Sequence, residues 1–194
     1  MPLAVLIVAA GLLIASVAWV SGQIGPGGMP GRGMTTSGDG PLADVSAVRR
    51  AADRFGEQWD LRSGEVMEFD NGFYVELADP SGDLATEVLV DPSSGAVQLE
   101  FGPAMMWNTA YGLHRGRVAA ATLAPEEALS VADEWLGTHR PGERAAEPEA
   151  FPGYYTLHTL MGDRVSGMLS VHGTSGAVWF HSWHGRFVGT TEPE

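Results

Sequence analysis

The chain repeats part of its own sequence at an offset of 81 residues, and this repeat limits the folds that it can adopt. Asn71–Val75 (Asn-Gly-Phe-Tyr-Val) aligns with Pro152–Thr156 (Pro-Gly-Tyr-Tyr-Thr), and Ser93–Val97 (Ser-Ser-Gly-Ala-Val) aligns with Thr174–Val178 (Thr-Ser-Gly-Ala-Val). The alignment runs without a gap over about 27 residues, which chance rarely supplies. We therefore predict one structural unit that occurs twice.

Each copy is predicted to begin with an amphipathic helix. Apolar residues three or four positions apart lie on one face of a helix, and both copies show this spacing. In the first copy the stripe is Val45, Val48, Ala52, Phe55 and Trp59, with Asp44 placed as the N-cap. In the second copy Pro125, Glu126 and Glu127 suit a helix N-terminus, and the stripe is Leu129, Ala132 and Leu136, with Trp135 alongside.

Short segments rich in β-branched and aromatic residues follow each helix and predict antiparallel strands. Turn sequences such as Asn71-Gly72 separate them. The predicted strands are Val66–Phe69, Phe73–Ala78, Glu87–Asp91 and Val97–Phe101 in the first copy, and Tyr154–Met161, Val165–His172 and Val178–His184 in the second. The fold class is therefore α+β, with a helix packed on a small antiparallel sheet in each copy. Since neither sheet alone covers much core, we expect the two units to pack together.

The N-terminal segment predicts a membrane anchor. Residues 2–20 carry no charge, and a helix of this length spans about 28 Å, close to the roughly 30 Å of a bilayer core. The alternative is a cleaved signal peptide, because Ser16 and Ala18 are spaced like a processing site, although the basic region that precedes such a site is missing. The predicted organisation is a transmembrane helix or signal anchor over 1–21, a Gly/Pro-rich flexible linker over 22–41, the first repeat over 42–108, an inter-repeat linker over 109–122 and the second repeat over 123–189.

The composition and the missing motifs exclude several functions. A net charge of −13 would repel a phosphate backbone, so we predict no nucleic-acid partner. Cysteine is absent, which excludes disulfides, thiolate metal sites and cysteine nucleophiles. The sequence contains neither a His-Glu-x-x-His helix nor a nucleophile elbow. We predict that the protein is not an enzyme and requires no cofactor.

The strand and turn residues resemble a known family. Glu87–Val97 (Glu-Val-Leu-Val-Asp-Pro-Ser-Ser-Gly-Ala-Val), preceded by a helix and a Phe-Tyr-Val-Glu strand, looks like part of a PepSY domain. The second copy is similar over 153–157, 167–171 and 175–179, so that the resemblance covers about residues 45–188. PepSY modules are associated with propeptides of thermolysin-like metallopeptidases and with cell-envelope proteins, and are proposed to inhibit peptidases. The resemblance implies a non-catalytic binding or regulatory module whose partner is a protein or peptide of the cell envelope, such as a peptidase.

The side of the membrane is predicted differently by charge and by resemblance. Arg32, Arg49 and Arg50 follow the apolar segment, and the positive-inside rule would place them in the cytoplasm. The PepSY resemblance implies an extracytoplasmic location. We predict a single-pass protein of the cell membrane with its C-terminal region outside the cytoplasm.

Two groups of residues are candidate sites. The first group is predicted to bind a partner or, alternatively, to fill the seam between the repeats: Met105, Met106, Trp107, Asn108, Trp179 and Trp183. The second group is predicted to bind Zn²⁺ or Cu²⁺: His158, His172, His181 and His184. In a strand, His181 and His184 would lie on opposite faces, whereas in a turn they would converge. A His-dependent metal-binding envelope protein is therefore the alternative function, and a purely structural envelope component is a third.

Overall fold

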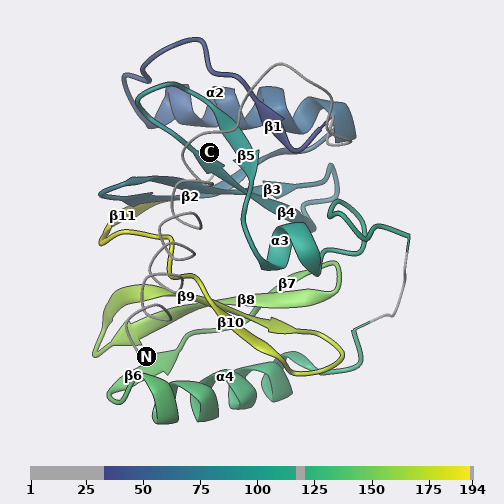
Figure 1. Cartoon of the computed structure of the whole chain (residues 1–194), viewed down its shortest axis with the longest axis vertical. Coiled ribbons are helices and arrows are strands. Elements are labelled where there is room, and N and C mark those ends of the chain that lie inside the picture. Colours follow the sequence, from purple (N-terminus) through teal and green to yellow (C-terminus); the bar gives the residue numbers. More distant parts are fainter. Residues whose placement is uncertain (1–32, 117–120, 193–194) are drawn as a thin grey trace, which may run out of the picture. The chain divides into compact units, whose positions relative to one another are not determined.

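The computed structural model describes residues 33–116 and 121–192, which belong to one compact unit. Its main elements are two antiparallel sheets and two long helices, so the α+β class is confirmed (Figure 1). The predicted anchor over 1–21 lies outside the described residues. Within the described ranges, no helix has the length and apolarity needed to cross a bilayer.

The first sheet has the strand order β1-β5-β4-β3-β2-β11, and every pair in it is antiparallel. Its central strands come from the first repeat: β2 (Arg62–Phe69), β3 (Gly72–Ala78), β4 (Leu84–Val90) and β5 (Val97–Leu99). The two edge strands, β1 (Thr35–Thr36) and β11 (Phe187–Thr191), come from either side of the repeats.

The second sheet has the order β10-β9-β8-β6, and β7 also pairs with β8. Its strands are β6 (Glu143–Ala145), β7 (Glu149–Phe151), β8 (Tyr154–Met161), β9 (Arg164–His172) and β10 (Val178–Phe180). The 81-residue offset carries β3, β4 and β5 onto β8, β9 and β10, so the repeat in the sequence is a repeat in the sheets. The counterpart of β2 is divided into β6 and β7 around Pro148, which has no N–H to donate to a ladder.

One long helix covers the outer face of each sheet (Figure 1). Helix α2 (Val45–Gly56) begins where Asp44 Oδ1 accepts a 2.8 Å hydrogen bond from the N–H of Ala47, as the sequence predicts. Helix α4 (Pro125–His139) begins with Glu127 Oε2 accepting a 2.8 Å hydrogen bond from the N–H of Ala124. The buried faces are Val48, Ala51, Ala52 and Phe55 in α2, and Ala128, Ala132 and Leu136 in α4. Two short helices complete the fold, η1 (Glu57–Trp59) and α3 (Pro103–Met106).

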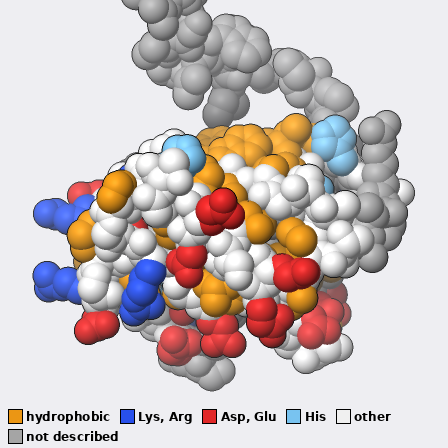
Figure 2. All heavy atoms as spheres, turned by 90° about the horizontal axis from the view of Figure 1, so that it is seen from below, with side chains coloured by type: hydrophobic (Ala, Val, Ile, Leu, Met, Phe, Trp, Pro, Cys, Tyr) orange, Lys and Arg blue, Asp and Glu red, His pale blue; other side chains and the backbone are white. Residues whose placement is uncertain are grey.

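The inner faces of the two sheets, defined as the faces turned toward each other, are in contact. Phe151 and Tyr154 of the second sheet join the apolar cluster under α2, and Met168 of β9 packs with Met67, Phe69 and Tyr74 of the first sheet. The expectation that the two units pack together agrees with these contacts. Figure 2, seen from the α4 side, shows acidic side chains spread over the face of the second unit and basic side chains at one edge.

Three local predictions differ from the structure. The flexible linker predicted over 22–41 is ordered in its last part, because Thr35 and Thr36 pair with β5 and the N–H of Gly40 donates to the carbonyl of Ser94. The strand predicted over Val97–Phe101 ends at Leu99, because Gly102 adopts a φ of +71° and α3 follows. The strand predicted over Val178–His184 ends at Phe180.

The end of the second repeat also belongs to the first sheet. Strand β11 pairs with β2 through Phe187↔Phe69 and Thr190↔Met67, so the chain crosses from one sheet to the other between Phe180 and Phe187. The second repeat, predicted as a unit over 123–189, therefore contributes its last residues to the sheet of the first repeat. The crossing segment, residues 181–186, brings His181 and His184 into contact with Glu100, which follows β5.

Candidate metal centre between the sheets

The inner face of the first sheet carries a row of glutamates, with Glu65 from β2, Glu76 from β3, Glu87 from β4 and Glu100 immediately after β5. Glu76 is the ladder partner of Glu87, and the N–H of Glu100 donates to the carbonyl of Glu87 at 2.9 Å. Glu76, Glu87 and Glu100 are buried, at 4%, 0% and 0% exposure. Burying a carboxylate costs free energy unless other groups compensate its charge. The groups that contact these glutamates therefore determine whether they stabilise the fold or bind a ligand.

Glu87 is held by three hydroxyl groups. Oε1 accepts hydrogen bonds from Tyr74 at 2.8 Å and Thr156 at 2.6 Å, and Oε2 accepts one from Tyr154 at 2.6 Å. Burial, followed by the charge of Glu100, raises the pKa of Glu87, and the three hydroxyl groups oppose that rise. Because two of the donors belong to the second sheet, Glu87 joins the two repeats.

The hydrogen bonds continue from Glu87 to a histidine. Thr156 Oγ1 lies 2.9 Å from Ser170 Oγ, which lies 2.9 Å from His181 Nε2. Thr156 and Ser170 are buried and alternate along β8 and β9 with apolar residues that face α4. The second sheet therefore offers a polar inner face to the glutamates of the first.

Glu100, His181 and His184 form a compact group between the two sheets. Their ligand atoms all lie within 4.8 Å of one another. Glu100 Oε1 is 2.8 Å from His184 Nε2 and 3.3 Å from His181 Nδ1, and it accepts a 3.1 Å hydrogen bond from Trp183 Nε1. Glu100 Oε2 and His181 Nδ1 are inaccessible and form no hydrogen bond with the described residues. Burial alone would raise the pKa of Glu100, but the two histidines outweigh it and lower the pKa to about 2.

A turn after β10 brings both imidazoles to this carboxylate. The N–H of Ser182 donates to the carbonyl of Phe180 at 3.0 Å, and Asn71 holds the turn from the first sheet through the carbonyl of Trp183 at 2.9 Å. The His184 ring stacks on Phe69 with centroids 4.3 Å apart, and the His181 ring stacks on Trp183 at 4.7 Å. Of the two geometries considered from the sequence, the turn is the one observed.

The donor set suits a divalent transition metal. Two imidazole nitrogens with one carboxylate oxygen form a common Zn²⁺ ligand set, with ligands about 2.0–2.2 Å from the ion. Ligand atoms at such distances in a tetrahedral arrangement lie roughly 3.3–3.6 Å apart. The 3.3 Å between Glu100 Oε1 and His181 Nδ1 already fits this spacing. The contact to His184 would have to open slightly.

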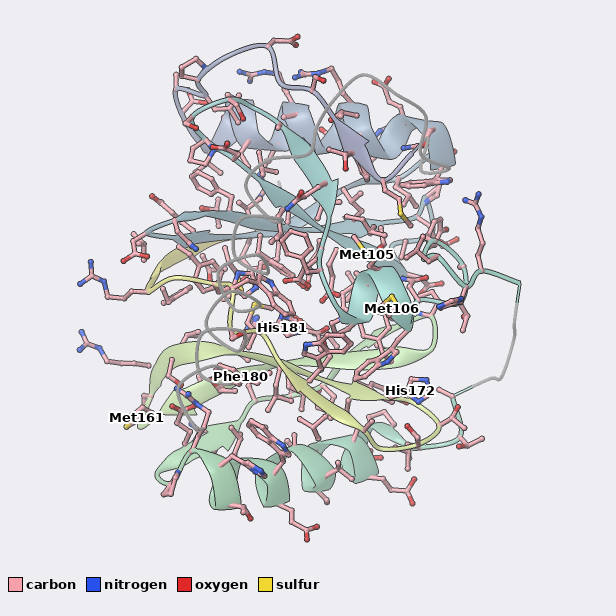
Figure 3. The ribbon with its side chains drawn as sticks, viewed as in Figure 1. Met105, Met106, Met161, His172, Phe180 and His181 are labelled. Atoms are coloured by element: carbon pink, nitrogen blue, oxygen red, sulfur yellow. The ribbon has the colours of Figure 1, made fainter. Side chains whose placement is uncertain are left out.

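The other two predicted histidines lie elsewhere. His158 faces Glu65, with Nε2 3.6 Å from Oε1. His172 is partly exposed at the end of β9, where its Nδ1 accepts a 3.1 Å hydrogen bond from the N–H of Ser175. Figure 3 shows His181 between the sheets and His172 apart from it. The structure thus gathers two of the four predicted histidines and adds Glu100, which the sequence did not single out.

The predicted partner-binding residues divide into buried and exposed members. Asn108 is fully buried, donating from Nδ2 to the carbonyl of Ala85 at 2.8 Å and accepting at Oδ1 from the N–H groups of Ala110 and Tyr111. Its role is therefore structural. Met105 packs against the core under α2. Met106 and Trp179 are each 39% exposed, and Trp107, Trp179 and Trp183 lie close to one another around α3 and Gly102.

Comparisons with known proteins leave the family open. No family model matches the chain, and no curated protein matches it. A solved structure, the Bacillus megaterium YpeB C-terminal domain, is similar to the chain with a TM-score of 0.36 and 11% sequence identity. The match covers 72% of this chain and 66% of that one, just under two thirds of its length.

Proposed function

We propose that the protein binds one divalent transition-metal ion, with Zn²⁺ preferred, through Glu100, His181 and His184. The observation that carries the proposal is the gathering of two imidazoles and one carboxylate within 4.8 Å, with buried atoms of Glu100 and His181 that have no hydrogen-bond partner among the described residues. A bound ion would give His181 Nδ1 a ligand bond. It would also replace the unfavourable burial of polar groups with coordination.

The surrounding hydrogen bonds support this use of His181. A metal-bound histidine usually donates its second ring N–H to a neighbouring acceptor, which fixes the ring and its tautomer. Ser170 Oγ stands 2.9 Å from His181 Nε2 in that role, leaving Nδ1 to face Glu100. The low pKa of Glu100 also means that this ligand is ionised at neutral pH without the metal.

Three protein ligands leave one position of a tetrahedral ion open, as in catalytic zinc sites, but the position of this centre between the repeats favours a structural role. Glu100 follows the last strand of the first repeat, whereas His181 and His184 belong to the segment that leaves the second sheet. An ion held by all three would join the repeats, and the buried side chains would keep substrates away. The proposed function is thus that of a non-catalytic module whose two repeats are joined by metal.

Equilibrium dialysis of the full chain against Zn²⁺ and Cu²⁺ tests this proposal. We expect one equivalent of Zn²⁺ to bind with micromolar or tighter affinity. The His181→Ala/His184→Ala variant should bind at least about 100-fold more weakly, since ligands contribute more than the surrounding groups whose loss costs 10–100-fold.

The matched control is His172→Ala, which removes an imidazole distant from the centre. This variant should bind Zn²⁺ as the unchanged protein does. The proposal is wrong if neither ion binds, or if His172→Ala weakens binding as much as the double variant. In that case the Glu100–histidine contacts serve only to hold the turn after β10.

We propose, as a second candidate function, that the module binds an extended apolar peptide outside the cytoplasm. The specific observation is an exposed apolar surface made by Phe101 (43% exposed), Met106 and Trp179, which we call the aromatic patch. Phe101 precedes Gly102 in the chain, and Gly102 packs closely against the rings of Trp179 and Trp183. An envelope peptidase, as implied by the PepSY resemblance, would be one source of such a peptide.

Binding to a pooled library of fluorescent, Leu- and Phe-rich decapeptides measures this second function. Selected peptides should bind the full chain, and Trp179→Ser should weaken binding at least about 10-fold, because aromatic side chains dominate such interfaces. Val188→Ser removes a more exposed apolar side chain on β11, at 55% against 39% for Trp179, and should have no effect. The absence of any selected peptide, or equal losses in both variants, would contradict this function.

A further inference from the structure

A series of three hydrogen bonds joins Glu87 of the first sheet to His181 of the proposed metal centre. Thr156 Oγ1 lies 2.6 Å from Glu87 Oε1 and 2.9 Å from Ser170 Oγ. Ser170 Oγ in turn lies 2.9 Å from Nε2 of His181. All four side chains are buried. Because buried polar groups bond to one another rather than to bulk water, the direction of each hydrogen bond depends on its neighbours in the series.

The direction of the series is set at Glu87. Its Oε1 accepts hydrogen bonds from Tyr74 and Thr156, and its Oε2 accepts one from Tyr154. An ionised carboxylate can only accept, and a proton on Oε2 would still leave Oε1 an acceptor. A hydroxyl group has one hydrogen to donate. Because Thr156 gives that hydrogen to Glu87, its oxygen can only accept from Ser170.

The same rule assigns the hydrogen on the His181 ring. Ser170 donates its one hydrogen to Thr156, so its oxygen must accept from Nε2 of His181. A neutral imidazole carries a hydrogen on only one nitrogen, so Nδ1 holds a lone pair. This nitrogen is 3.3 Å from Glu100 Oε1 and forms no hydrogen bond with the described residues. It therefore has the form in which an imidazole nitrogen binds a metal ion.

We propose that Glu87, Thr156 and Ser170 are positioning residues, which hold His181 in the tautomer that binds the metal through Nδ1. This role rests on the proposed metal-binding function. The opposite tautomer would place the ring hydrogen on Nδ1 and would require both hydroxyl groups to reverse. Glu87 Oε1 would then lose its 2.6 Å hydrogen bond from Thr156. The series therefore keeps Nδ1 free of a hydrogen before an ion binds.

The series also makes the metal centre dependent on both sheets. Glu87 lies in β4 of the first sheet, whereas Thr156 and Ser170 lie in β8 and β9 of the second. The hydrogen bond between Thr156 and Glu87 exists only when the two sheets are packed together. We therefore expect the tautomer of His181, and with it the affinity for the ion, to depend on this contact between the repeats.

Nuclear magnetic resonance of the full chain, labelled with ¹⁵N at histidine, tests the assignment without metal. Long-range ¹H–¹⁵N correlations distinguish the two tautomers, and His181→Ala identifies the signals of the ring. At about pH 8.5, well above the usual pKa of an imidazole, His181 should carry its hydrogen on Nε2. In Thr156→Val, which has nearly the same shape, Ser170 is free to donate to Nε2, so the ring hydrogen should move to Nδ1.

The affinity for Zn²⁺ is the second measurement. Thr156→Val should bind Zn²⁺ about 10–100-fold more weakly, as expected for the loss of a group that orients a ligand. Thr156→Ser keeps the hydroxyl group and should retain both the tautomer and the affinity. Thr159→Val removes another buried hydroxyl group of β8, which contacts Ser166 at 3.0 Å outside the series, and should also leave both unchanged.

The proposal is overturned if the unchanged protein carries the His181 hydrogen on Nδ1, or if Thr156→Val keeps the tautomer of the unchanged protein. Equal losses of affinity in Thr156→Val and Thr159→Val would overturn it too. The tautomer is measured without metal, so the two proposals can fail separately. A protein that shows the expected tautomers but binds no Zn²⁺ would contradict the metal site while confirming that the series fixes the ring.

Discussion

Replacing Glu87 with alanine is expected to lower the free energy of unfolding by about 3–5 kcal/mol, because each buried hydroxyl group left without its acceptor costs about 1–3 kcal/mol. The change leaves the hydroxyl groups of Tyr74, Tyr154 and Thr156 buried without their acceptor. It also opens a cavity between the sheets. Urea-induced unfolding at pH 7 measures the loss.

Two further variants serve as controls for this loss of stability. Glu87→Gln keeps one acceptor oxygen and nearly the same volume, so it should lose less stability than Glu87→Ala. Glu134→Ala, on the exposed face of α4, should change stability by no more than about 0.5 kcal/mol. A loss below about 1 kcal/mol for Glu87→Ala would mean that water satisfies the three hydroxyl groups and that Glu87 does not join the repeats.

Raising the pH from 5 to 9 is expected to destabilise the metal-free protein. Burial, followed by the charge of nearby Glu149, raises the pKa of Glu76 from 4.5 to about 10 and that of Glu65 from 4.5 to about 7. The folded state therefore retains protons that the unfolded state releases above about pH 4.5. Stability falls as the pH rises, by up to about 1.4 kcal/mol per pH unit for each such proton.

Glu100 acts in the opposite direction. Its pKa of about 2 lies below the unfolded value of 4.5, so its contribution is present above pH 4.5 and is lost as the pH falls toward 2. The combined effect is a stability maximum near pH 5. Urea unfolding in the presence of a chelator at pH 3, 5, 7 and 9 measures this profile.

Glu76→Gln separates the contributions to this profile. Glu149, Glu65 and Glu87 are the charged neighbours of Glu76, and the uncharged amide should interact less unfavourably with them at alkaline pH. The variant should lose less stability between pH 5 and 9 and exceed the unchanged protein at pH 9. If the free energy of unfolding changes with pH in the same way in Glu76→Gln and in the unchanged protein, Glu76 ionises normally in the folded state.

The sequence predicted the repeated framework because local patterns determine it. The stripe that ends at Trp59 marks the first helix, although Trp59 itself lies in η1, and the stripe that ends at Leu136 marks the second. Turn sequences such as Asn71-Gly72 mark the limits of the strands. The prediction was least accurate for strands whose partners are far away in the sequence. Thr35–Thr36 and β11 are strands because they pair with β5 and β2 of the first sheet.

The centre was only half predictable from the sequence. His181 and His184 are close in sequence, so their convergence in a turn could be foreseen, whereas Glu100 meets them only because the chain crosses between the sheets. Glu76 and Glu87 alternate with apolar residues, as side chains do on the solvated face of an antiparallel sheet. A polar face that packs on a second polar face has the same pattern as one in water. Only the position of the second sheet distinguishes the two.

The anomalous diffraction of Zn²⁺-soaked crystals, recorded above and below the zinc absorption edge, shows whether Glu100, His181 and His184 bind the ion. We expect an anomalous peak bonded to Glu100, His181 Nδ1 and His184 Nε2 at about 2.0–2.2 Å. A peak at surface residues alone, with Glu100 and the two histidines in direct contact and no ion between them, would contradict the proposed metal site.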